Sequence, residues 1–311
     1  MQSQNNRDIV VAALKHAAPY VRMYKGKVFV LKAGGEIFAK PESTRALVEQ
    51  MAILHQVGIR IVLVHGGGPQ STQLAEALGM PTQFIEGRRV TDESALDVAT
   101  MVLNGQINTR ILAACRDVGL PAVGISGVDA GLIRAHKRPP VKMNGKDSKA
   151  VDYGFVGDID SVDAGILRTQ LDSGLVPVVS PLSSDQSGTL LNINADTVAA
   201  ALASELNAEK LILTTGASGI LEDRTDPNTV MSYLDLAGLR KLREAGSLAD
   251  GMLPKAAAIE AAIKGGVARV HIISYKLADS LLLEVFTNEG TGTLVVANVN
   301  TLSPAEQAPG N

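Results

Sequence analysis

Short apolar runs rich in β-branched residues alternate along this chain with segments in which apolar residues recur every three or four positions. The first pattern predicts buried strands and the second predicts amphipathic helices. The expected strands are 27–32, 59–64, 121–125, 175–180, 210–215, 269–273 and 293–297, and the expected helices are 43–56, 70–79, 92–117, 195–206, 233–245 and 255–264. This alternation predicts an α/β fold, a mostly parallel sheet with helices on both faces.

Composition narrows the class of protein further. Aromatic residues make up only 3% of the chain, so the core must be built from Ala, Val, Leu and Ile, which suits buried parallel strands. A net charge of −3 gives no electrostatic reason to expect nucleic acid as a partner. The one cysteine, Cys115, cannot form an intrachain disulfide, and we expect it to be a small buried residue in a reducing cytoplasm. The sequence has neither a membrane-length apolar run nor a signal-peptide core, so neither membrane association nor export is expected.

Two of the expected strands run into consecutive glycines. Residues 28–35 read Val-Phe-Val-Leu-Lys-Ala-Gly-Gly, and residues 61–69 read Ile-Val-Leu-Val-His-Gly-Gly-Gly-Pro. Backbone without Cβ lets an anion approach closely, and a following helix offers unpaired N–H groups at its positive end. We therefore expect an anionic ligand at the carboxyl ends of parallel strands, although such glycines can also serve only to make tight turns. The P-loop, dinucleotide-binding and nucleophile-elbow patterns are all absent, and no zinc-ligand spacing or dedicated metal site is expected.

Three charged residues stand at ends of the expected elements. Lys32 ends the first strand, Asp196 opens a helix and Lys255 lies just before another. Each has an ordinary alternative role, because a strand-end lysine can extend to solvent and an acid complements a helix N-terminus. Together with the glycine turns, two cations and one acid suit in-line phosphoryl transfer, in which the protein neutralises the moving group and aligns donor and acceptor.

Two regions depart from the alternation. Residues 133–156 contain Asn144-Gly145, a strong hairpin signal, and their basic residues are expected on a solvated hairpin rather than against a ligand. These basic residues are Lys137, Arg138, Lys142, Lys146 and Lys149. An additional helix near 6–24 carries an apolar stripe that needs a surface to pack on, such as another subunit.

At this point the sequence resembles the amino acid kinase family over residues 17–297, and within it the branch that phosphorylates N-acetyl-L-glutamate in arginine biosynthesis. The matching segments are 18–35, 64–69, 86–91 (Glu-Gly-Arg-Arg-Val-Thr), 192–196 (Asn-Ile-Asn-Ala-Asp), 250–255 (Asp-Gly-Met-Leu-Pro-Lys) and 283–293. The resemblance implies a three-layer α/β/α sandwich with a central, mostly parallel sheet and two lobes. Its expected parts are an oligomerisation helix at 1–24, an amino-acid-substrate lobe at 25–185, an ATP lobe at 186–297 and a disordered tail at 298–311.

The resemblance also implies a reaction and roles for individual residues. ATP, with Mg²⁺ carried by the nucleotide, would phosphorylate the side-chain carboxylate of N-acetyl-L-glutamate to give an acyl phosphate. Lys32 and Lys255 would stabilise the transferring phosphoryl group, and Asp196 would orient both lysines. The expected phosphate-binding residues are Gly34 and Gly35, and the expected substrate-binding residues are Gly66, Gly67, Gly68, Arg89, Asn192 and Asn194, with Arg89 on the α-carboxylate. The expected ATP-binding residues are Thr215, Gly216, Gly219 and Met252.

Family members with a helix before Pro-Tyr are hexamers, built as trimers of dimers, that arginine inhibits. The same control is expected here, with Tyr20, Lys210, His271, Glu284 and Gly290 around the effector, although a plain dimer is the alternative. Three features depart from the family pattern: Gly216 where relatives have Asp, the turn Ser274-Tyr275-Lys276, and Val128 where many relatives have lysine.

Other functions stay open on the sequence alone. One is a non-catalytic arginine-sensing homologue, and retention of Lys32, Asp196 and Lys255 favours the enzyme over it. Another is a kinase for a different acid or for another N-acylated glutamate, such as the N-succinyl form. Arg89 with Asn192 and Asn194 disfavours the kinases of aspartate, glutamate, carbamate and nucleotides. An acetylglutamate synthase would be expected to need an additional acyltransferase domain.

Overall fold

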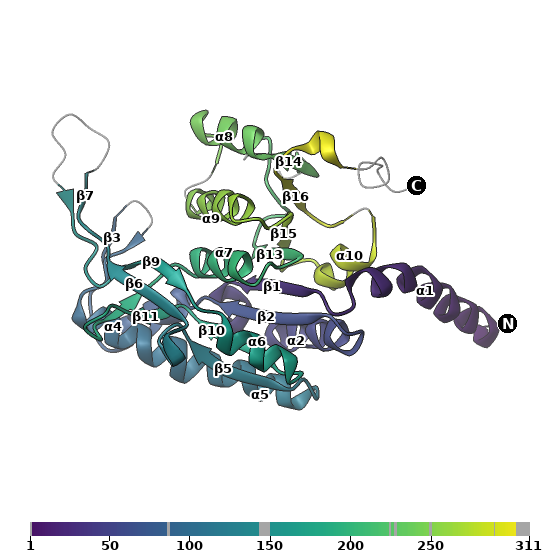
Figure 1. Cartoon of the computed structure of the whole chain (residues 1–311), viewed down its shortest axis with the longest axis horizontal. Helices are drawn as coiled ribbons and strands as arrows, with labels where there is room; N and C mark the ends of the chain where they lie inside the picture. Colours follow the sequence, from purple (N-terminus) through teal and green to yellow (C-terminus); the bar gives the residue numbers. More distant parts are fainter. Residues whose placement is uncertain are drawn as a thin grey trace.

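A computed structural model describes residues 2–85, 88–142, 150–223, 225–226, 229–248, 251–288 and 290–302. Its centre is an eight-stranded sheet that contains every strand expected from the sequence (Figure 1). In spatial order the strands are β14 (Tyr233–Asp235), β16 (Thr293–Val296), β15 (Arg269–Ser274), β13 (Lys210–Thr215), β1 (Val28–Ala33), β2 (Arg60–His65), β10 (Val176–Ser180) and β5 (Ala122–Ser126). All neighbours are parallel except β15 and β16. The prediction of a mostly parallel sheet is therefore confirmed.

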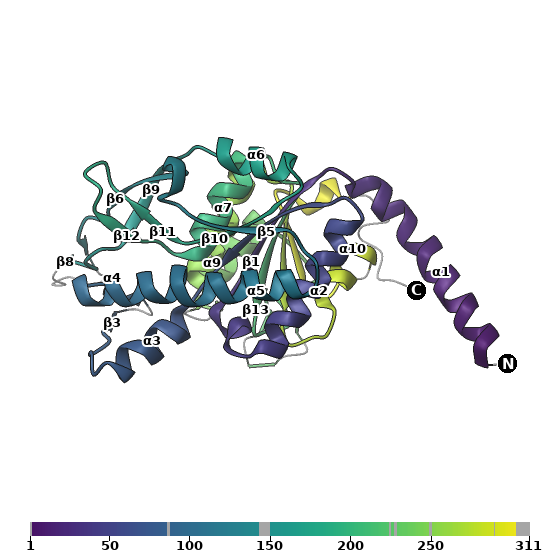
Figure 2. The same cartoon turned by 90° about the horizontal axis from the view of Figure 1, so that it is seen from below.

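Helices cover both faces of this sheet, because successive side chains of its strands point to opposite sides. Phe29 and Leu31 pack toward one helical layer, whereas Val30 packs toward the other. The first layer contains α2 (Pro41–Gln56), α3 (Gly68–Ala77), α5 (Thr109–Asp117) and α10 (Ser280–Phe286), and the second contains α6 (Gly165–Asp172), α7 (Ala195–Glu205), α8 (Leu236–Glu244) and α9 (Met252–Lys264). Figure 2 shows α2 and α5 on one side of the strands and α6 and α7 on the other. Cys115 is buried in the first layer, as expected, and burial raises the pKa of its thiol to about 11.

The expected helix 92–117 is a continuous helix, but its middle part is π-helical rather than α-helical. It begins as α4 (Glu93–Thr100), widens into the π-helical η2 (Met101–Asn108) and ends as α5. The expected helix 233–245 is wrong at its start, because residues 233–235 form edge strand β14. The side chain of Asp235 accepts a hydrogen bond from the Gly238 N–H at 2.7 Å, and this cap starts α8 only at Leu236.

A second sheet forms where the alternation breaks down. Its strands, in spatial order, are β12 (Leu190–Asn192), β11 (Leu182–Ser184), β6 (Ile133–Lys137) and β9 (Gly157–Val162). Two short ribbons extend beyond it: β3 (Phe84–Ile85) with β4 (Arg88–Arg89), and β7 (Val141–Lys142) with β8 (Ala150–Val151) (Figure 1). The sequence pattern did not predict this sheet, α6 or α10, and the predicted turn at Asn144-Gly145 lies outside the described residues. Short 3₁₀ turns complete the fold: η1 (Gly35–Ala39), η3 (Asp129–Gly131) and η4 (Val299–Thr301).

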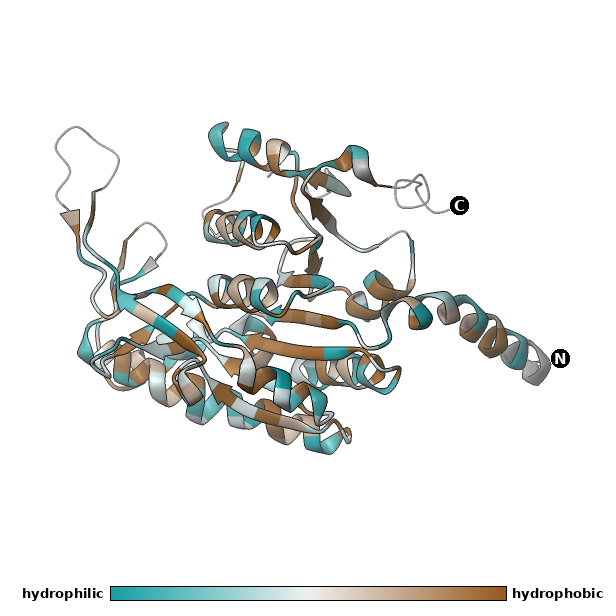
Figure 3. Ribbon diagram, viewed as in Figure 1, coloured by the Kyte–Doolittle hydropathy of each residue, from teal (hydrophilic) through white to brown (hydrophobic). Residues whose placement is uncertain are grey.

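The N-terminal helix α1 (Gln2–Tyr24) projects away from the rest of the molecule (Figures 1 and 2). Ile9, Val10 and Leu14 are all more than half exposed on it. In Figure 3 the most hydrophobic colouring lies on the central strands, whereas α1 mixes apolar and polar residues. Within the described part of the chain, every helix is too short or too polar to cross a bilayer.

Candidate active site

A cleft with a cavity volume of about 580 Å³ opens at the carboxyl ends of β1 and β2. Strand register explains why, since Lys32 lies beside Val64 and Leu213, and Ala33 lies beside His65. The two glycine turns that follow these strands therefore face the same space. The predicted residues that line the cleft are Lys32, Gly34, Gly35, Gly66, Gly67, Gly68, Arg89, Asn192, Asn194 and Asp196.

Three of the predicted residues form one buried cluster of charges. The Nζ atoms of Lys32 and Lys255 lie 3.1 Å and 2.9 Å from the same carboxylate oxygen, Oδ1 of Asp196. Burial opposes the charge of Asp196, but the two lysines outweigh it and hold the pKa of this carboxyl below its usual range. Burial and the nearby Lys32 lower the pKa of Lys255. The cluster carries a net charge of +1, so it favours a bound anion.

Helix starts position two of these side chains. Asn194 caps α7: its Oδ1 accepts hydrogen bonds from the backbone N–H groups of Asp196 and Thr197. This fixes Asp196 in the first turn, where an acid complements the helix dipole. Lys255 was expected just before its helix, but α9 begins at Met252, so Lys255 lies inside the first turn. A lysine there is unfavourable unless an anion shares the site, and Asp196 supplies one negative charge.

Neighbouring side chains pack closely against Gly35 and Gly67, one in each glycine turn, and leave no room for a Cβ atom there. A Cβ on Gly67 would lie 2.6 Å from Ile107 Cδ1, and one on Gly35 would lie 2.6 Å from Gln70 Oε1. Gly67 precedes the first turn of α3, whose first N–H groups have no partner within the helix. Among the described residues, none accepts a hydrogen bond from the N–H of Gly67 or Gly68. The turn thus offers donors to an anion.

Arg89 forms the outer wall of the cleft. Its guanidinium donates hydrogen bonds to Thr72 Oγ1 and to the Gly68 carbonyl, and lies 4.9 Å from the centre of the Phe84 ring. Half-burial lowers its pKa, but guanidinium stays charged. None of the described carboxylates forms an ion pair with it. Nη1 also donates to Thr82 Oγ1 at 3.4 Å, so both hydrogens of Nη2 and one of Nη1 have protein partners, and the remaining N–H groups can meet a carboxylate ligand.

Sequence reasoning missed some of the lining residues. Arg138 was expected on a solvated hairpin, but it lines the cleft with only 18% of its side chain exposed, held by both carboxylate oxygens of Asp158. That expectation is wrong for Arg138, because the second sheet folds it inward. Phe84 and Tyr153 also line the cleft, and a single aromatic residue in a polar segment carries no signal of this.

The four residues predicted to bind ATP do not line this cavity. Thr215 ends β13 beside Ser274 of β15, at the same edge of the sheet as Lys32. A Cβ on Gly216 would lie 3.3 Å from the Tyr275 hydroxyl, and one on Gly219 would lie 2.6 Å from Thr293 Oγ1, so both glycines relieve crowding. Met252 opens α9 and packs partly against the core. Their assignment to ATP stays a prediction.

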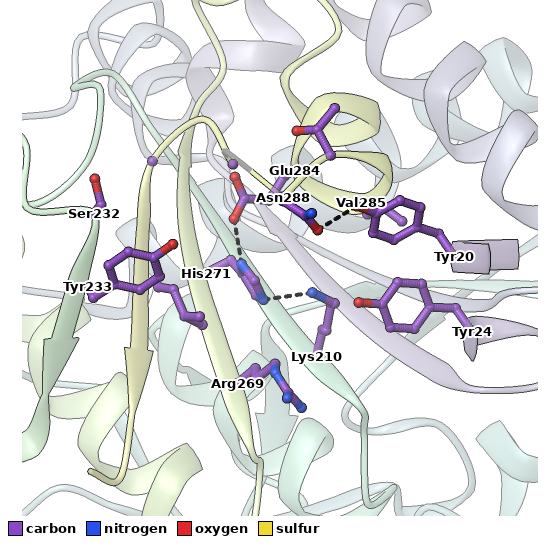
Figure 4. Close-up of a pocket in the computed structure, with 14 residues that line it drawn as sticks. Tyr20, Tyr24, Lys210, Ser232, Tyr233, Arg269, His271, Glu284, Val285 and Asn288 are labelled. Atoms are coloured by element: carbon purple, nitrogen blue, oxygen red, sulfur yellow. Dashed lines mark hydrogen bonds and ion pairs between the residues drawn. The ribbon is translucent and has the colours of Figure 1, made fainter. Parts of the chain in front are cut away.

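The five residues predicted around an effector line a second, smaller pocket of about 100 Å³ (Figure 4). His271 is central: its Nδ1–H donates to Glu284 Oε1 at 2.5 Å, and its Nε2 accepts from Lys210 Nζ at 3.0 Å. Glu284 Oε2 accepts from the Thr291 N–H at 2.6 Å. Burial, with the charge of Lys210, lowers the pKa of His271 to about 4.

Two further features connect this pocket to distant parts of the chain. Tyr20, near the end of α1, donates a hydrogen bond to Asn288 Oδ1 at 2.5 Å. Gly290 has a left-handed φ of +61°, and a Cβ there would lie 3.1 Å from Glu284 Oε2. The pocket is therefore shaped jointly by α1, the loop after α10 and strands β13 and β15.

Groups of His, Cys, Asp and Glu that could hold a metal ion are absent from the described residues. The acid of the cleft, Asp196, already contacts two lysines.

Comparison with known proteins identifies relatives. The model of the amino acid kinase family matches residues 27–274. The acetylglutamate kinase of Myxococcus xanthus is 47% identical over 297 residues, covering 94% of this chain and 96% of that protein. The acetylglutamate kinase of Heliobacterium modesticaldum is 43% identical, covering 91% and 96%.

Solved structures share the fold. The N-acetylglutamate synthase of Neisseria gonorrhoeae complexed with coenzyme A and L-arginine superposes with a TM-score of 0.79 at 30% identity. That match covers 93% of this chain but only 65% of the synthase chain. The carbamate kinase of Giardia lamblia bound to AMP-PNP has a TM-score of 0.64 at 19% identity, covering 88% of this chain and 99% of that chain, a likeness of fold alone.

Proposed function

This chain belongs to the amino acid kinase family, and from that membership we propose that it transfers the γ-phosphoryl group of ATP to the side-chain carboxylate of N-acetyl-L-glutamate. Relatives named acetylglutamate kinase, 40–47% identical over nearly the whole chain, support this substrate. The observation that carries the chemistry is the net positive cluster in which Lys32 and Lys255 share one carboxylate oxygen of Asp196, with Lys32 and Asp196 lining the cleft.

The reaction needs charge neutralisation and alignment more than acid–base chemistry. A carboxylate oxygen of N-acetylglutamate forms a bond to the γ-phosphorus as the bond to the β-phosphate oxygen breaks, and ADP leaves. Lys32 and Lys255 stabilise the negative oxygens of the moving group. Asp196 holds both ammonium groups at one point, so they are oriented before the substrates arrive. The N–H groups of the two glycine turns donate to phosphate and carboxylate oxygens.

Residues at the outer wall of the cleft orient the substrate. Arg89 binds the α-carboxylate with the remaining N–H groups of its guanidinium, and Asn192 binds the acetamido part. The Oδ1 atom of Asn194 already accepts the hydrogen bonds that cap α7. Asn194 therefore positions Asp196 and does not bind substrate through Oδ1. Selection of the acetyl group over a larger acyl group depends on the space beside Asn192.

ATP occupies the carboxyl ends of β13 and β15, with Thr215, Gly216, Gly219 and Met252 around it. Mg²⁺ bound to the nucleotide shields its phosphate charges. Because Asp196 is shared by two lysines, it would not need to serve as a ligand of this ion, which would enter with the nucleotide.

Arginine occupies the second pocket as a feedback inhibitor. Support comes from the convergence of Tyr20, Lys210, His271, Glu284 and Gly290 there, and from a related synthase solved with L-arginine. The exposed apolar side chains of α1 join dimers into a hexamer. A variant that begins at Ala17 should lose arginine inhibition and have the mass of a dimer, which light scattering measures. An unchanged mass would refute this role of α1.

The first test of the activity is an acyl-phosphate trapping assay with hydroxylamine. The mixture contains ATP, Mg²⁺ and N-acetyl-L-glutamate, with and without arginine, and N-succinyl-L-glutamate and L-glutamate serve as alternative acceptors. Trapped product that depends on N-acetylglutamate supports the kinase. Suppression by arginine supports the second pocket as its site. A folded protein that binds arginine without turnover would instead indicate a regulatory homologue.

A further inference from the structure

His65 is a buried polar residue near the cleft that the proposed chemistry does not use. It ends β2, immediately before the second glycine turn, and its side chain is fully buried. It does not line the cleft itself. Burial lowers the pKa of His65 to about 4, so the imidazole is neutral at pH 7 and has one donor and one acceptor.

The π-helical segment determines which nitrogen carries the proton. Asn108, its last residue, donates one amide hydrogen to the Val178 carbonyl at 2.9 Å. Only the NH₂ group can face that carbonyl, so the same Nδ2 atom, 3.2 Å from His65 Nε2, donates its second hydrogen there. Nε2 is thus an acceptor, and the proton lies on Nδ1. Nδ1 lies 3.2 Å from the Gly66 carbonyl oxygen and donates to it.

The geometry of the peptide unit carries this contact into the cleft. The described chain has no cis peptide bonds, so the Gly66 carbonyl and the Gly67 N–H point in opposite directions. The carbonyl is held on the buried side by His65, which leaves the Gly67 N–H directed to the opposite side, where Gly66, Gly67 and Gly68 line the cavity. Glycine has the widest backbone freedom, so without such a restraint this peptide could rotate.

The first glycine turn is restrained in the same way. Gln70, also buried, donates from Nε2 to the Gly35 carbonyl at 2.6 Å. Both turns therefore have a carbonyl held by a buried side chain that neither lines the cleft nor belongs to the lysine cluster.

We infer that His65 is a positioning residue, which holds the Gly66–Gly67 peptide so that its N–H faces the oxygens of the substrate during phosphoryl transfer. The inference rests on the proposed function. Asn108 and the π-helical segment maintain the tautomer that this role needs. Preorganised N–H donors act mainly in the transition state, so the effect belongs in kcat more than in KM.

Two substitutions separate this role from simple packing. In His65→Asn the side-chain amide can still donate to the Gly66 carbonyl near the position of Nδ1. In His65→Gln the amide reaches the position of Nε2, so it can meet Asn108 but not the Gly66 carbonyl. A matched control is His55→Gln, because His55 also bonds a glycine carbonyl, that of Gly174 at 3.0 Å, away from the cleft.

We expect His65→Gln to lower kcat about 10- to 100-fold, with KM for both substrates changed by less than about threefold. His65→Asn should recover most of this loss, and His55→Gln should match the parent. Unfolding midpoints are measured in parallel to confirm that each variant is folded. Equal losses in the Asn and Gln variants, or no loss in either, would overturn the inference.

A second measurement does not depend on turnover. ¹⁵N NMR of the histidine-labelled full chain at pH 7 reports the tautomer of each imidazole, with His65→Asn identifying the His65 signals. A neutral ring protonated on Nδ1 supports the inference. A ring protonated on Nε2, or a charged ring, overturns it even if the kinase activity stands. Conversely, a parent without turnover refutes the proposed function, while the tautomer still decides how the Gly66 carbonyl is held.

Discussion

Two buried clusters of charged side chains flank the neighbouring strands β1 and β13, and their charges are balanced differently. Lys32 lies near the carboxyl end of β1, whereas Lys210 lies at the amino end of β13. The cleft cluster joins Lys32 and Lys255 to Asp196 and has one positive charge in excess. The second-pocket cluster joins Lys210, neutral His271 and Glu284, and its charges cancel. The cleft holds about 580 Å³ of space and the second pocket about 100 Å³.

The excess positive charge of the cleft cluster favours a bound anion. The charges of the second-pocket cluster neutralise each other without a ligand. An uncompensated buried cation is costly unless a ligand completes it, so we expect the cleft cluster to lower the stability of the fold and to favour binding of an anion. In the second pocket each nitrogen of His271 has a protein partner. Similar residue types thus give a net positive charge in one cluster and no net charge in the other. Substitutions in the two clusters should therefore have different effects on stability and turnover.

The largest expected effect is that of Lys255→Met on turnover. Loss of a cation at the moving phosphoryl group should lower kcat/KM by at least about a thousandfold, or about 4 kcal/mol. Stability should be unchanged or higher, because the remaining Lys32–Asp196 pair is neutral. The trapping assay and urea unfolding measure the two quantities. Near-normal turnover would show that this cluster does not perform the chemistry.

The second effect concerns stability in the other cluster. Glu284→Gln removes the negative charge that faces His271 and Lys210, and breaking a buried pair should cost about 3 kcal/mol of unfolding free energy. Arginine inhibition should also weaken. The control is Glu49→Gln, which breaks an exposed pair with Arg45 and should cost about 0.5 kcal/mol or less. If Lys255→Met destabilised the fold as much as Glu284→Gln, the contrast between the clusters would fail.

Acidification should destabilise the fold through a histidine behind the cleft. Folding lowers the pKa of His65 from 6.5 to about 4, so between these values the unfolded chain binds a proton that the folded chain does not. Stability therefore falls as pH drops through this window, by about 1.4 kcal/mol per pH unit, or about 2 kcal/mol from pH 6.5 to 5. Urea unfolding across this range measures the slope, and His65→Gln should reduce it by the contribution of His65. His271 acts in the same direction in the second pocket. A parent slope that His65→Gln leaves unaltered would contradict the lowered pKa of His65.

The smallest expected effect tests the outer wall of the cleft. Arg89→Lys keeps the charge but loses the planar, two-pronged donor, so KM for N-acetylglutamate should rise about tenfold, with a smaller change in kcat. The matched control is Arg138→Lys, because Arg138 is already paired with Asp158 and should affect KM less. Initial rates over a range of substrate concentrations decide between them, and the reverse order would assign the α-carboxylate to Arg138.

Prediction from sequence succeeded where a signal is local. Apolar runs indicate buried strands, and all seven expected strands lie within one residue of their expected bounds. Prediction failed where packing decides. Arg138 has the surroundings of a surface residue in sequence, and only the pairing of β6 with β9 brings it near Asp158. Likewise, η2 follows an ordinary helical pattern, and its π-helical form becomes visible only through the placement of Asn108 against β2 and β10.

By itself the sequence determined the class of fold, the two glycine turns and the residue types available for charge neutralisation, because these depend on short-range periodicity and on the chemistry of single side chains. It did not determine that two lysines 223 positions apart would share one oxygen of Asp196. It also did not determine which way the Gly66–Gly67 peptide faces. Only the tertiary structure decided these, because the order and register of parallel strands bring together segments whose sequences carry no mark of one another.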